Sequence, residues 1–592
     1  MLSKYKLNQL YFKDTQFANL MTRRIFNVLL IANPYDAFML EDDGRIDEKI
    51  FNEYTSLSLR YPPRFSQVST EEEALTQLEN MSFDLVICMP STGDNDSFDI
   101  GRHIKEKYEH IPIVILTPFS HGITKRIINE DLSAFEYVFC WLGNTDLLVS
   151  IIKLMEDKMN LEHDVQEVGI RFYSSILPNL YKFVLKQSQE FSTEALNAHQ
   201  RTLRMRGRPK IVLARTYQEA MEVYRKYQNN ILGVITDVRF PKVERGEKDG
   251  LAGIKLCAEI RKNDPFVPLI IQSSESENAS YAAKYGASFI DKNSKKMDVD
   301  LRRIVSDNFG FGDFVFRNPE TGEEIARVRN LKELQNILFA VPAESFLYHI
   351  SRNHVSRWLY SRAMFPVAEF LKPITWSSLQ DVDAHRRIIF EAIVKYRKMK
   401  NQGVVAVFKR DRFDRYSNFA RIGDGSLGGK GRGLAFIDNM VKRYPEFEEF
   451  ENARVAIPKT VVLCTDVFDE FMDINNLYQI ALSDADDDTI LRYFLKAKLP
   501  DRLVEDFFTF FDVVKSPIAI RSSSLLEDSH YQPFAGIYNT YMIPYLDDRY
   551  EMLRMLSDAI KGVYASVYFR DSKAYMQATS NVIDQEKMAV IL

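Results

Sequence analysis

The sequence has few cysteines and no long apolar run. Only four of its 592 residues are cysteine, and none of them forms a C-x-x-C pair, which argues against a disulfide framework or a cysteine zinc site and favours a reducing compartment. No stretch reaches 18 apolar residues, so no membrane-spanning helix is predicted. The first residues, MLSKYKLNQLYFKDTQF, contain no apolar core of signal-peptide length. We therefore expect a cytoplasmic protein without a membrane partner.

Neither sign of charge dominates. Lysine and arginine total 77, aspartate and glutamate total 82, and the formal net charge is −5. This balance gives no support to a broad nucleic-acid-binding surface. Hydrophobic residues make up 46% and charged residues 27%, as in globular domains rather than disordered or fibrous chains. At about 150 residues per domain, the length predicts about four domains.

Apolar runs alternate with amphipathic stretches in the first half of the chain. The run FNVLLIA at residues 26–32 is of the kind buried in a parallel sheet, and the alternation recurs after about residue 205. After an N-terminal extension (1–23), this rhythm predicts two doubly wound α/β domains, in residues 24–160 and 161–312. The expected strands are 26–32, 83–88, 113–116, 137–140, 210–214, 231–236, 268–271 and 288–290, and the expected helices are 71–80, 100–108, 144–158, 218–228, 253–263 and 299–309.

Polar residues follow three strands of the second predicted domain. Asp237 and Ser273 each end a strand, and Lys292 lies in the loop after the last one. Because sites in such sheets lie beyond the carboxyl ends of the strands, these side chains are expected to converge. Their order resembles the flavodoxin-like receiver domain of bacterial response regulators. The resemblance implies that Asp237 accepts a phosphoryl group, that Ser273 senses it and that Lys292 pairs with it. The alternative is a structural aspartate at a strand end.

A receiver of this kind also needs an acidic pair at the end of its first strand to hold Mg²⁺. Residues 161–173 contain no apolar strand that ends in two acids, and Glu167 is the only near candidate. The phosphoacceptor role of Asp237 and its structural alternative therefore both stay open.

The first predicted domain departs further from the receiver pattern. Met89 stands where the aspartate is expected, and residues 138–143 contain no lysine. Asn33 and Pro34 replace the acidic pair, so Thr117 is the only match. A thioether cannot attack a phosphoryl donor, so we predict a degenerate receiver that serves docking or dimerisation.

Residues 313–402 do not continue the alternation of apolar runs and amphipathic stretches. A turn signal at 318–322 precedes helical patterns at 331–341 and 385–400. The segment RNHVSRWLYSRAMF mixes basic and aromatic residues, as nucleic-acid or phosphate contacts can. Without a fold motif, a mainly helical connector with amphipathic faces is favoured, and no nucleic-acid partner is predicted.

A glycine-dense segment follows the strand predicted at 404–408. Residues 423–433, GDGSLGGKGRG, are expected to form a loop that precedes a helix starting at 434. Glycines let the backbone N–H groups turn toward phosphate oxygens, and Lys430 adds a charge. Gly431 stands where a Walker A loop requires Ser or Thr. A flexible surface loop is the alternative.

A second motif follows the strand predicted at 517–520. Arg521 ends this strand, and the hydroxyl residues Ser522 and Ser523 come next. An arginine followed by hydroxyls suits a polyphosphate, because it combines bidentate charged bonds with neutral donors.

The motifs GGKG, IRSSSLLED, FAG and YNTY, in this order, resemble the N-terminal nucleotide-binding domain of the phosphoenolpyruvate synthase and pyruvate phosphate dikinase family. The segments 457–471, 566–575 and 588–591 are similar to later elements of that domain. The resemblance covers about residues 420–592 and implies that residues 403–592 form an ATP-grasp-type α+β domain with ATP and Mg²⁺ as cofactors, the metal ligands being unknown. It implies Lys430 and Arg521 as catalytic residues and an ATP site of Gly428, Gly429, Lys430, Gly431, Arg521, Ser522, Ser523, Glu527, Asp528 and Arg570.

Members of this family pass a phosphoryl group from ATP through a histidine to pyruvate. None of the nine histidines here lies in the family's T-S-H pattern, and His530 lies inside the ATP segment itself. We therefore expect that the relay histidine and the pyruvate domain lie outside this chain, which looks incomplete at its C-terminus.

The leading hypothesis is an ATP-binding phosphotransferase that resembles phosphoenolpyruvate synthase and carries regulatory receiver-like domains. Its expected partners are ATP, pyruvate or another phosphoryl acceptor held by the missing part, and a histidine kinase or a second copy bound through the receiver-like domains. The alternative is a two-component signalling protein whose nucleotide-binding module is not catalytic.

Overall fold

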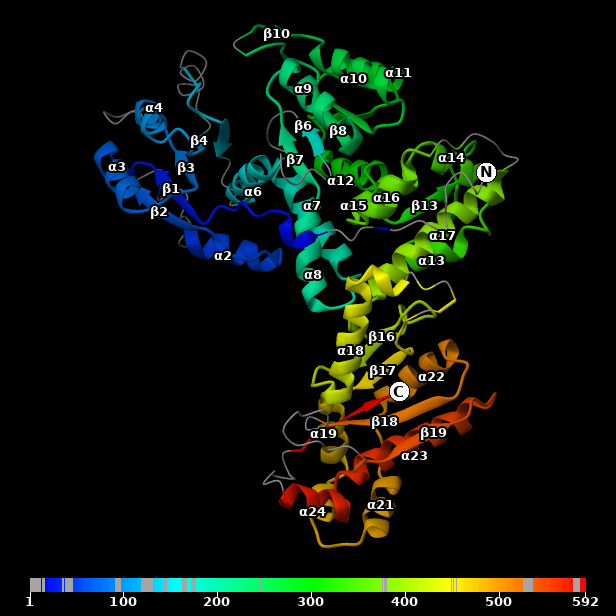
Figure 1. Ribbon diagram of the computed structural model, residues 1–592. Helices are drawn as coiled ribbons and strands as arrows, with labels where there is room; N and C mark the ends of the chain where they lie inside the picture. The colour runs from blue at the N-terminus through cyan, green and yellow to red at the C-terminus, as the bar shows by residue number, and fades with distance from the viewer. Residues whose placement is uncertain are drawn as a thin grey trace. The chain divides into compact units, whose positions relative to one another are not determined.

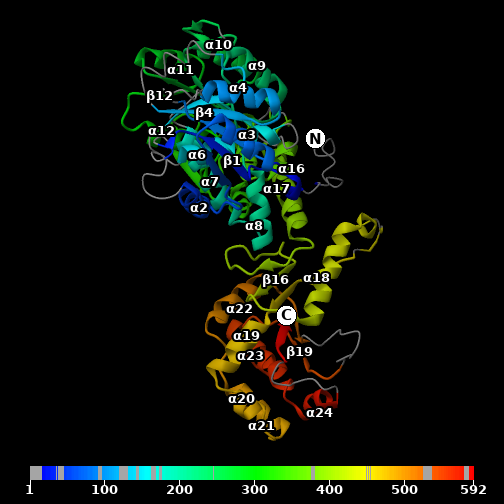
Figure 2. The same ribbon diagram turned by 90° about the vertical axis from the view of Figure 1, so that its left-hand side faces the viewer.

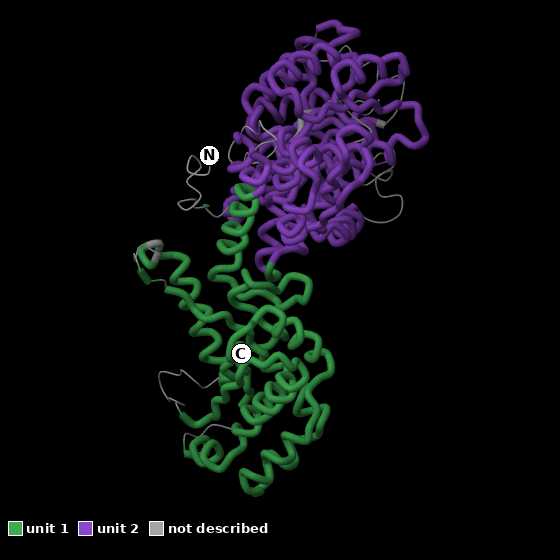
Figure 3. The backbone as a smooth tube through the Cα atoms, turned by 90° about the vertical axis from the view of Figure 1, so that its right-hand side faces the viewer, with its two compact units in different colours: residues 1–14, 196–198, 387–592 green, residues 15–195, 199–386 purple. Residues whose placement is uncertain are grey.

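The chain forms two compact units, which Figure 3 draws in different colours. The N-terminal unit comprises residues 15–195 and 199–386, and the C-terminal unit comprises residues 1–14, 196–198 and 387–592. The computed structural model describes residues 12, 16–34, 37, 46–90, 97–118, 131–141, 146–161, 168–171, 177–244, 246–374, 376, 381–448, 450, 452–453, 455–524, 536–578 and 586–592. No helix within these ranges is long and apolar enough to cross a membrane.

The first sheet of the N-terminal unit has five parallel strands in the order β2-β1-β3-β4-β5. On one face α2 contacts α6. On the other, ion pairs link α3 to α4, which lie side by side in Figures 1 and 2. The elements are β1 (Asn27–Ile31), α2 (Ile46–Ser56), β2 (Arg64–Val68), α3 (Glu71–Asn80), β3 (Leu85–Cys88), α4 (Ser97–Lys107), β4 (Ile113–Pro118), β5 (Tyr137–Trp141) and α6 (Asp146–Asn160), with the short turn η3 (Phe17–Asn19) before them.

The second sheet is also parallel, in the order β12-β11-β8-β6-β7. Read from β7, this is the same flavodoxin-like order as in the first sheet. Right-handed crossovers place α7 and α12 on one face and α9 and α10 on the other. The elements are β6 (Val168–Arg171), α7 (Leu177–Ser192), α8 (Ala198–Arg204), η4 (Met205–Gly207), β7 (Lys210–Leu213), α9 (Tyr217–Tyr227), η5 (Gln228–Asn230), β8 (Ile231–Asp237), β9 (Phe240–Pro241), β10 (Lys248–Asp249), α10 (Ala252–Asn263), β11 (Leu269–Ser273), η6 (Ser276–Asn278), α11 (Ala279–Lys284), β12 (Ser288–Asp291) and α12 (Met297–Asn308).

The predicted α/β class with parallel sheets is confirmed, but several elements were not predicted, among them two strands of the sheets and two of the helices beside them. Strand β2, with the sequence RFSQV, lies at the sheet edge and is mostly exposed or half-buried, so it lacks an apolar run. Strand β6, with the sequence VGIR, contains only two large apolar residues. The helices α2 and α7 precede the next strand in their domains and were also missed.

The connector forms a hairpin followed by helices. Its mixed basic and aromatic segment is largely core: the Arg362 guanidinium lies 4.0 Å from the ring centres of Trp358 and Phe191 and donates to the carbonyl oxygens of Gly310 and Gly312. The elements are β13 (Phe314–Arg317), β14 (Glu324–Val328), α13 (Leu331–Ile337), α14 (Ala343–Ser351), α15 (His354–Ser361), α16 (Phe365–Leu371) and α17 (Val382–Asn401), the last of which continues into the C-terminal unit.

The C-terminal unit contains a mixed sheet in the order β15-β16-β17-β20-β18-β19. Helix α18 covers one face, where Leu434 packs against Val462 and Ala589, and α19 and α23 contribute Phe468 and Tyr564 to the core of the other face. The elements are β15 (Ala406–Val407), β16 (Phe419–Ile422), α18 (Gly428–Arg443), η8 (Pro445–Glu448), β17 (Thr460–Leu463), α19 (Thr465–Ile474), α20 (Tyr478–Ala481), α21 (Asp487–Lys496), α22 (Arg502–Val513), β18 (Ile518–Ser524), β19 (Thr540–Ile543), α23 (Arg549–Ser566), α24 (Arg570–Ala578) and β20 (Met588–Ile591).

Candidate functional site

Three strands of the C-terminal unit end at the same edge of its sheet. Strands β16 and β17 are parallel, and β18 runs in the same direction because both β17 and β18 are antiparallel to β20. The loop of residues 423–427 follows β16, Thr465 begins the helix after β17, and Ser524 is the last residue of β18. The two sequence motifs therefore meet at one sheet edge.

The loop of residues 423–427 is held by side chains from the start of α19. Asp466 accepts hydrogen bonds from the backbone N–H groups of Asp424, at 2.8 Å, and Gly425, at 3.0 Å. The Thr465 hydroxyl accepts a bond from the Ser426 N–H at 2.9 Å. These N–H groups bind the protein itself, so the loop is pre-formed. Sequence reasoning missed Thr465 and Asp466, although both follow a buried strand in the way that singled out Asp237.

The helix after this loop begins earlier than expected. Residues 428–433 belong to α18, so the prediction of a loop through residue 433 is wrong. The Ser523 hydroxyl accepts a hydrogen bond from the Gly431 N–H at 2.9 Å and donates one to the Leu427 carbonyl at 2.7 Å. A Cβ atom on Gly428, whose φ is +70°, would lie 1.8 Å from the Ser523 carbonyl oxygen. Glycine is therefore required here because the helix and β18 approach so closely.

The two predicted catalytic cations lie near this junction. The Lys430 ammonium donates to the Ser522 hydroxyl at 3.2 Å. Arg521 is exposed, and its guanidinium makes no hydrogen bond or ion pair with any residue that the structure describes. Arg521 pairs across the sheet with Ile591, and Ile591 packs against residues of α18. Arg521 therefore lies on the face of the sheet that α18 covers.

The second sheet brings Asp237, Ser273 and Lys292 together. The Lys292 ammonium forms a hydrogen-bonded ion pair with the Asp237 carboxylate, and the Lys292 N–H donates to the Ser273 carbonyl at 2.9 Å. The Ser273 hydroxyl accepts bonds from the Glu275 N–H at 3.1 Å and the Asn278 amide at 2.9 Å.

The carboxyl end of β6 is Arg171 rather than an acid. Glu167 precedes this strand in the sequence and lies outside the described residues. Within the described ranges, no group of three His, Cys, Asp or Glu side chains could hold a metal ion.

The strand ends of the first sheet carry other residues than those expected of a receiver domain. Met89 follows β3, is 2% exposed and donates its N–H to the Ile31 carbonyl at 2.8 Å. Thr117 is buried in β4. Strand β5 supplies no lysine, and residues 142–143 lie outside the described residues. A buried thioether thus stands at the position of the expected nucleophile.

Comparison with known proteins bears on the C-terminal unit. Residues 424–592 match the family described as the AMP/ATP-binding domain of pyruvate phosphate dikinase. The match runs from the glycine-rich loop to the end of the sheet, and it supports ATP binding and a kinase-like use of ATP by this unit.

Comparisons with curated proteins and with solved structures give no further evidence on function. No curated protein matches the chain. Two solved structures described as two-component system response regulator/GGDEF domain proteins are each 14% identical to this chain, covering 47% of it and 96% of the solved chain, with TM-scores of 0.22. That score is too low for the likeness to bear on fold or function.

Of the remaining members of the predicted ATP site, the structure describes Arg570. Arg570 begins α24, and its backbone N–H donates to the Asp487 carboxylate of α21 at 2.8 Å. Between described residues, no hydrogen bond or ion pair joins Arg570 to the glycine-rich loop. Glu527, Asp528 and His530 lie outside the described residues.

Proposed function

We propose that the C-terminal unit binds ATP with its phosphates at the edge where loop 423–427, the first turn of α18 and the end of β18 meet. The observation that carries this proposal is the placement of Lys430 against Ser522, with exposed Arg521 on the same strand and on the face covered by α18. Charge-assisted bonds from arginine and lysine are the strongest that a protein offers to a phosphate.

The chain's own residues would prepare this site before ATP arrives. The Lys430 ammonium donates to a neutral hydroxyl, that of Ser522, and a phosphate oxygen could take the place of this acceptor. The buried N–H of Gly429 at the helix start has no acceptor among the described residues, and the helix dipole favours an anion there. Asp466 keeps the loop in place and so limits the conformational cost of binding.

We further propose that the protein is a phosphotransferase of the phosphoenolpyruvate synthase type. ATP would phosphorylate a relay histidine outside this chain, and pyruvate or another acceptor would receive the group. Cations at the sheet edge would stabilise negative charge on the transferred group. Mg²⁺ would supply further charge neutralisation, but among the described residues no group of three His, Cys, Asp or Glu side chains could hold it.

Calorimetric titration of the full chain with ATP tests the site. Lys430→Ala and Arg521→Ala are each expected to raise the dissociation constant at least tenfold, because a charged hydrogen bond contributes about 1.5–3 kcal/mol. Lys515→Ala is the matched control, since exposed Lys515 lies just before β18, at the other end of the strand. Unchanged affinity in both test variants would show that the nucleotide binds elsewhere.

ATP turnover separates this function from the alternative, a nucleotide-binding signalling module without catalysis. Wild-type chain supplied with ATP and with an added relay-histidine domain of the family should transfer a phosphoryl group to that histidine, and Arg521→Ala should lower the rate. Tight ATP binding without any product would favour the non-catalytic alternative.

A specific observation favours a second function for the second sheet. The ion pair of Lys292 with Asp237, beside Ser273, is the arrangement that a phosphoaspartate site needs: a carboxylate nucleophile, a cation for the phosphoryl oxygens and a hydroxyl. We propose that Asp237 accepts a phosphoryl group and that the first domain, with buried Met89 in this place, docks or dimerises instead.

Acetyl phosphate with Mg²⁺ tests this second function. We expect acid-labile phosphate on the wild-type chain that is lost in Asp237→Asn. Asp291→Asn is the matched control, because Asp291 ends strand β12, which is separated from β8 by β11. Incorporation that is absent from the wild type, or that persists in Asp237→Asn, would leave Asp237 a structural residue.

A further inference from the structure

A cleft of about 370 Å³ lies in the N-terminal unit between the second sheet and the connector helices. One wall contains Asn229 and the loop of residues 263–266, which precede β8 and β11. The other contains Asn353 and the segment of residues 372–374, which lie before α15 and after α16. The cleft is at the amino-terminal edge of the sheet, whereas Asp237 is at the carboxyl-terminal edge. It is therefore separate from the proposed phosphoacceptor site.

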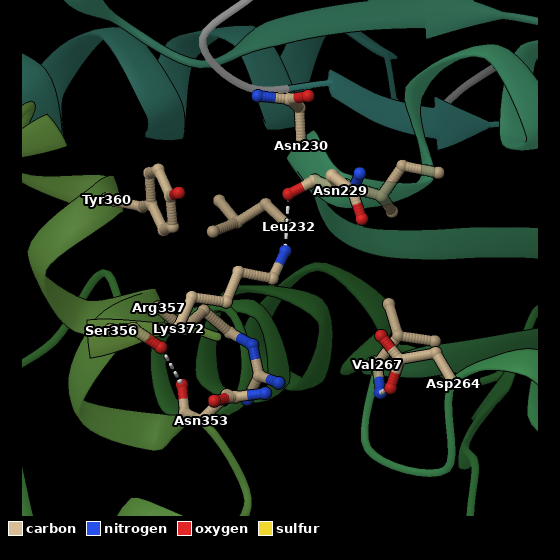
Figure 4. Close-up of a pocket in the computed structure, with 11 residues that line it drawn as sticks. Asn229, Asn230, Leu232, Asp264, Val267, Asn353, Ser356, Arg357, Tyr360 and Lys372 are labelled. Atoms are coloured by element: carbon tan, nitrogen blue, oxygen red, sulfur yellow. Dashed lines mark hydrogen bonds between the residues drawn. The ribbon is translucent and has the colours of Figure 1, made fainter. Parts of the chain in front are cut away.

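A smaller recess of about 20 Å³ adjoins this cleft and shares part of its lining. Arg357, Ser356 and Tyr360 of α15 line the recess and not the larger cleft. Figure 4 shows Arg357 and Lys372 reaching in from the connector helices, with Asp264 and Val267 on the facing wall. The recess thus forms a polar extension of a wider cleft.

Arg357 is the charged side chain of this region whose role the contacts within the protein do not explain. It belongs to the mixed basic and aromatic segment of the connector, but it is not part of the ring stack around Arg362. Its guanidinium donates to the Phe266 carbonyl at 3.0 Å and forms no ion pair with a described residue. Burial lowers its pKa to about 10, and the nearby Asp264 carboxylate offsets part of this effect. A guanidinium has five N–H donors, so Arg357 retains donors for a ligand in the recess.

The charge of the lining favours an anion. The Lys372 ammonium donates to the Asn229 carbonyl at the same junction. Asp264 is the one carboxylate among the described lining residues, and it accepts hydrogen bonds from the N–H groups of Phe266 at 2.9 Å and Val267 at 3.0 Å. Asp264 therefore holds its own loop.

The wider cleft is lined by polar residues, such as Gln228 and Ser351, together with aromatic and apolar side chains. Tyr224 and Phe266 line it from the sheet side, and Pro373, Ile374 and Trp376 line it from the connector side. Its volume is within the range of small-molecule sites, which combine an apolar lining with a few placed polar groups. The rings of Tyr224, Phe266 and Trp376 can pack against a flat ring, while the recess suits a compact polar end.

We propose that this cleft binds a small molecule that carries a carboxylate on a flat apolar body, with the carboxylate in the recess against Arg357 and Lys372. A recess of about 20 Å³ has room for one or two water-sized atoms, which matches carboxylate oxygens better than a phosphate group. The ligand touches both the second sheet and the connector helices, so its binding stabilises the junction between them.

The test uses the full chain and two matched pairs of probes, benzoate with benzamide and indole-3-acetate with indole-3-acetamide. Calorimetry should detect binding of at least one carboxylate and much weaker binding of its neutral amide. Arg357→Ala should weaken carboxylate binding about tenfold or more, and Arg357→Lys should restore part of it. Lys262→Ala is the control, because Lys262 is exposed on α10 and pairs with Glu259 outside the cleft.

A second variant is needed because Arg357→Ala could lose binding through misfolding alone. Lys372→Gln removes the other cation, and circular dichroism shows whether each variant keeps its fold. The proposal is overturned if neither carboxylate binds below about 10 mM, if the amides bind equally well, or if folded Arg357→Ala and Lys372→Gln both bind like the wild type. Tighter binding of inorganic phosphate at the same residues would overturn the choice of a carboxylate.

Discussion

The residues around Gly428 show why the glycine-dense segment has its composition. Gly428 combines a left-handed backbone with a neighbour that leaves no room for a side chain, since a Cβ atom would lie 1.8 Å from the Ser523 carbonyl oxygen. Gly423 is similar, because its Cβ would lie 2.4 Å from a carboxylate oxygen of Asp466. Protein packing therefore explains these two glycines before any phosphate is considered.

Gly428→Ala is expected to lower the free energy of unfolding of the C-terminal unit by roughly 1–3 kcal/mol and to weaken ATP binding, because the start of α18 must move away from β18. Gly536→Ala is a matched control, since Gly536 has a φ of +81° and no atom of another described residue within 4 Å of its Cβ position. Chemical denaturation and calorimetry measure the two effects. Equal losses of unfolding free energy in both variants would mean that these losses come from backbone strain alone and not from the close approach of α18 to β18.

Two histidines of the connector form a buried neutral pair. His349 accepts a hydrogen bond from the Arg317 N–H on Nε2 at 2.9 Å, so its proton is on Nδ1 and is donated to Nδ1 of His354, 2.9 Å away. Burial, reinforced by neighbouring arginines, lowers the pKa of His349 to about 4 and that of His354 to about 2. Protonation of either ring would break this chain of bonds.

The N-terminal unit should therefore lose stability as the pH falls from about 6.5 toward about 4. Unfolded histidines take up protons below a pKa of about 6.5 and the folded pair does not, so each histidine can contribute up to about 1.4 kcal/mol per pH unit. His349→Gln with His354→Gln should flatten this slope, whereas His103→Gln, at an exposed position of α4, should not. Denaturant titrations at several pH values measure it, and an unchanged slope in the double variant would rule out this pair as its source.

At the scale of elements, one buried carboxylate joins α6 to the second sheet. Asp157 accepts hydrogen bonds from the Tyr181 hydroxyl at 2.8 Å, from the Arg208 guanidinium at 2.6 Å and from the Ile211 N–H at 3.0 Å. Asp157 has no exposed surface. The contact links the last helix of the first domain to the first helix and an edge strand of the second, so the two sheets share one packed junction.

Asp157→Asn should lower the free energy of unfolding of the N-terminal unit by about 3–5 kcal/mol, because it leaves the buried Arg208 charge without a partner. Asp157→Asn with Arg208→Met should recover part of this loss, since no charge then stays buried. Denaturant unfolding measures both. A loss below about 1 kcal/mol in the single variant, or none recovered in the double variant, would show that the pair adds little to the junction.

At the scale of the whole molecule, each unit has its own hydrophobic core. Thermal unfolding is therefore expected to show two transitions. ATP should raise only the transition of the C-terminal unit, by about 2.7 kcal/mol of stability at 100 times the dissociation constant. Gly428→Ala should lower that transition and Asp157→Asn the other, as scanning calorimetry would show. A single transition that ATP and both substitutions shift together would mean that the units unfold as one.

The sequence by itself determined the buried strands, and it singled out residues whose types suit phosphates. Strands such as β1 and β8 were predictable because continuous apolar runs must be buried, whereas the phosphate roles of Lys430, Arg521 and Ser522 stay predictions that rest on their residue types. The polar edge strand β2 and the short β6 carry too little apolar sequence, and pairing with their neighbours made them strands.

Only the tertiary structure decided which distant groups meet. Asp466 holds the loop 423–427, Ser523 sets the first turn of α18, and Arg357 faces a recess, although nothing in their local sequence indicates these partners. Such contacts depend on sheet order and on how closely helices approach strands. Those features are decided by packing the whole core and not by the periodicity of any one segment.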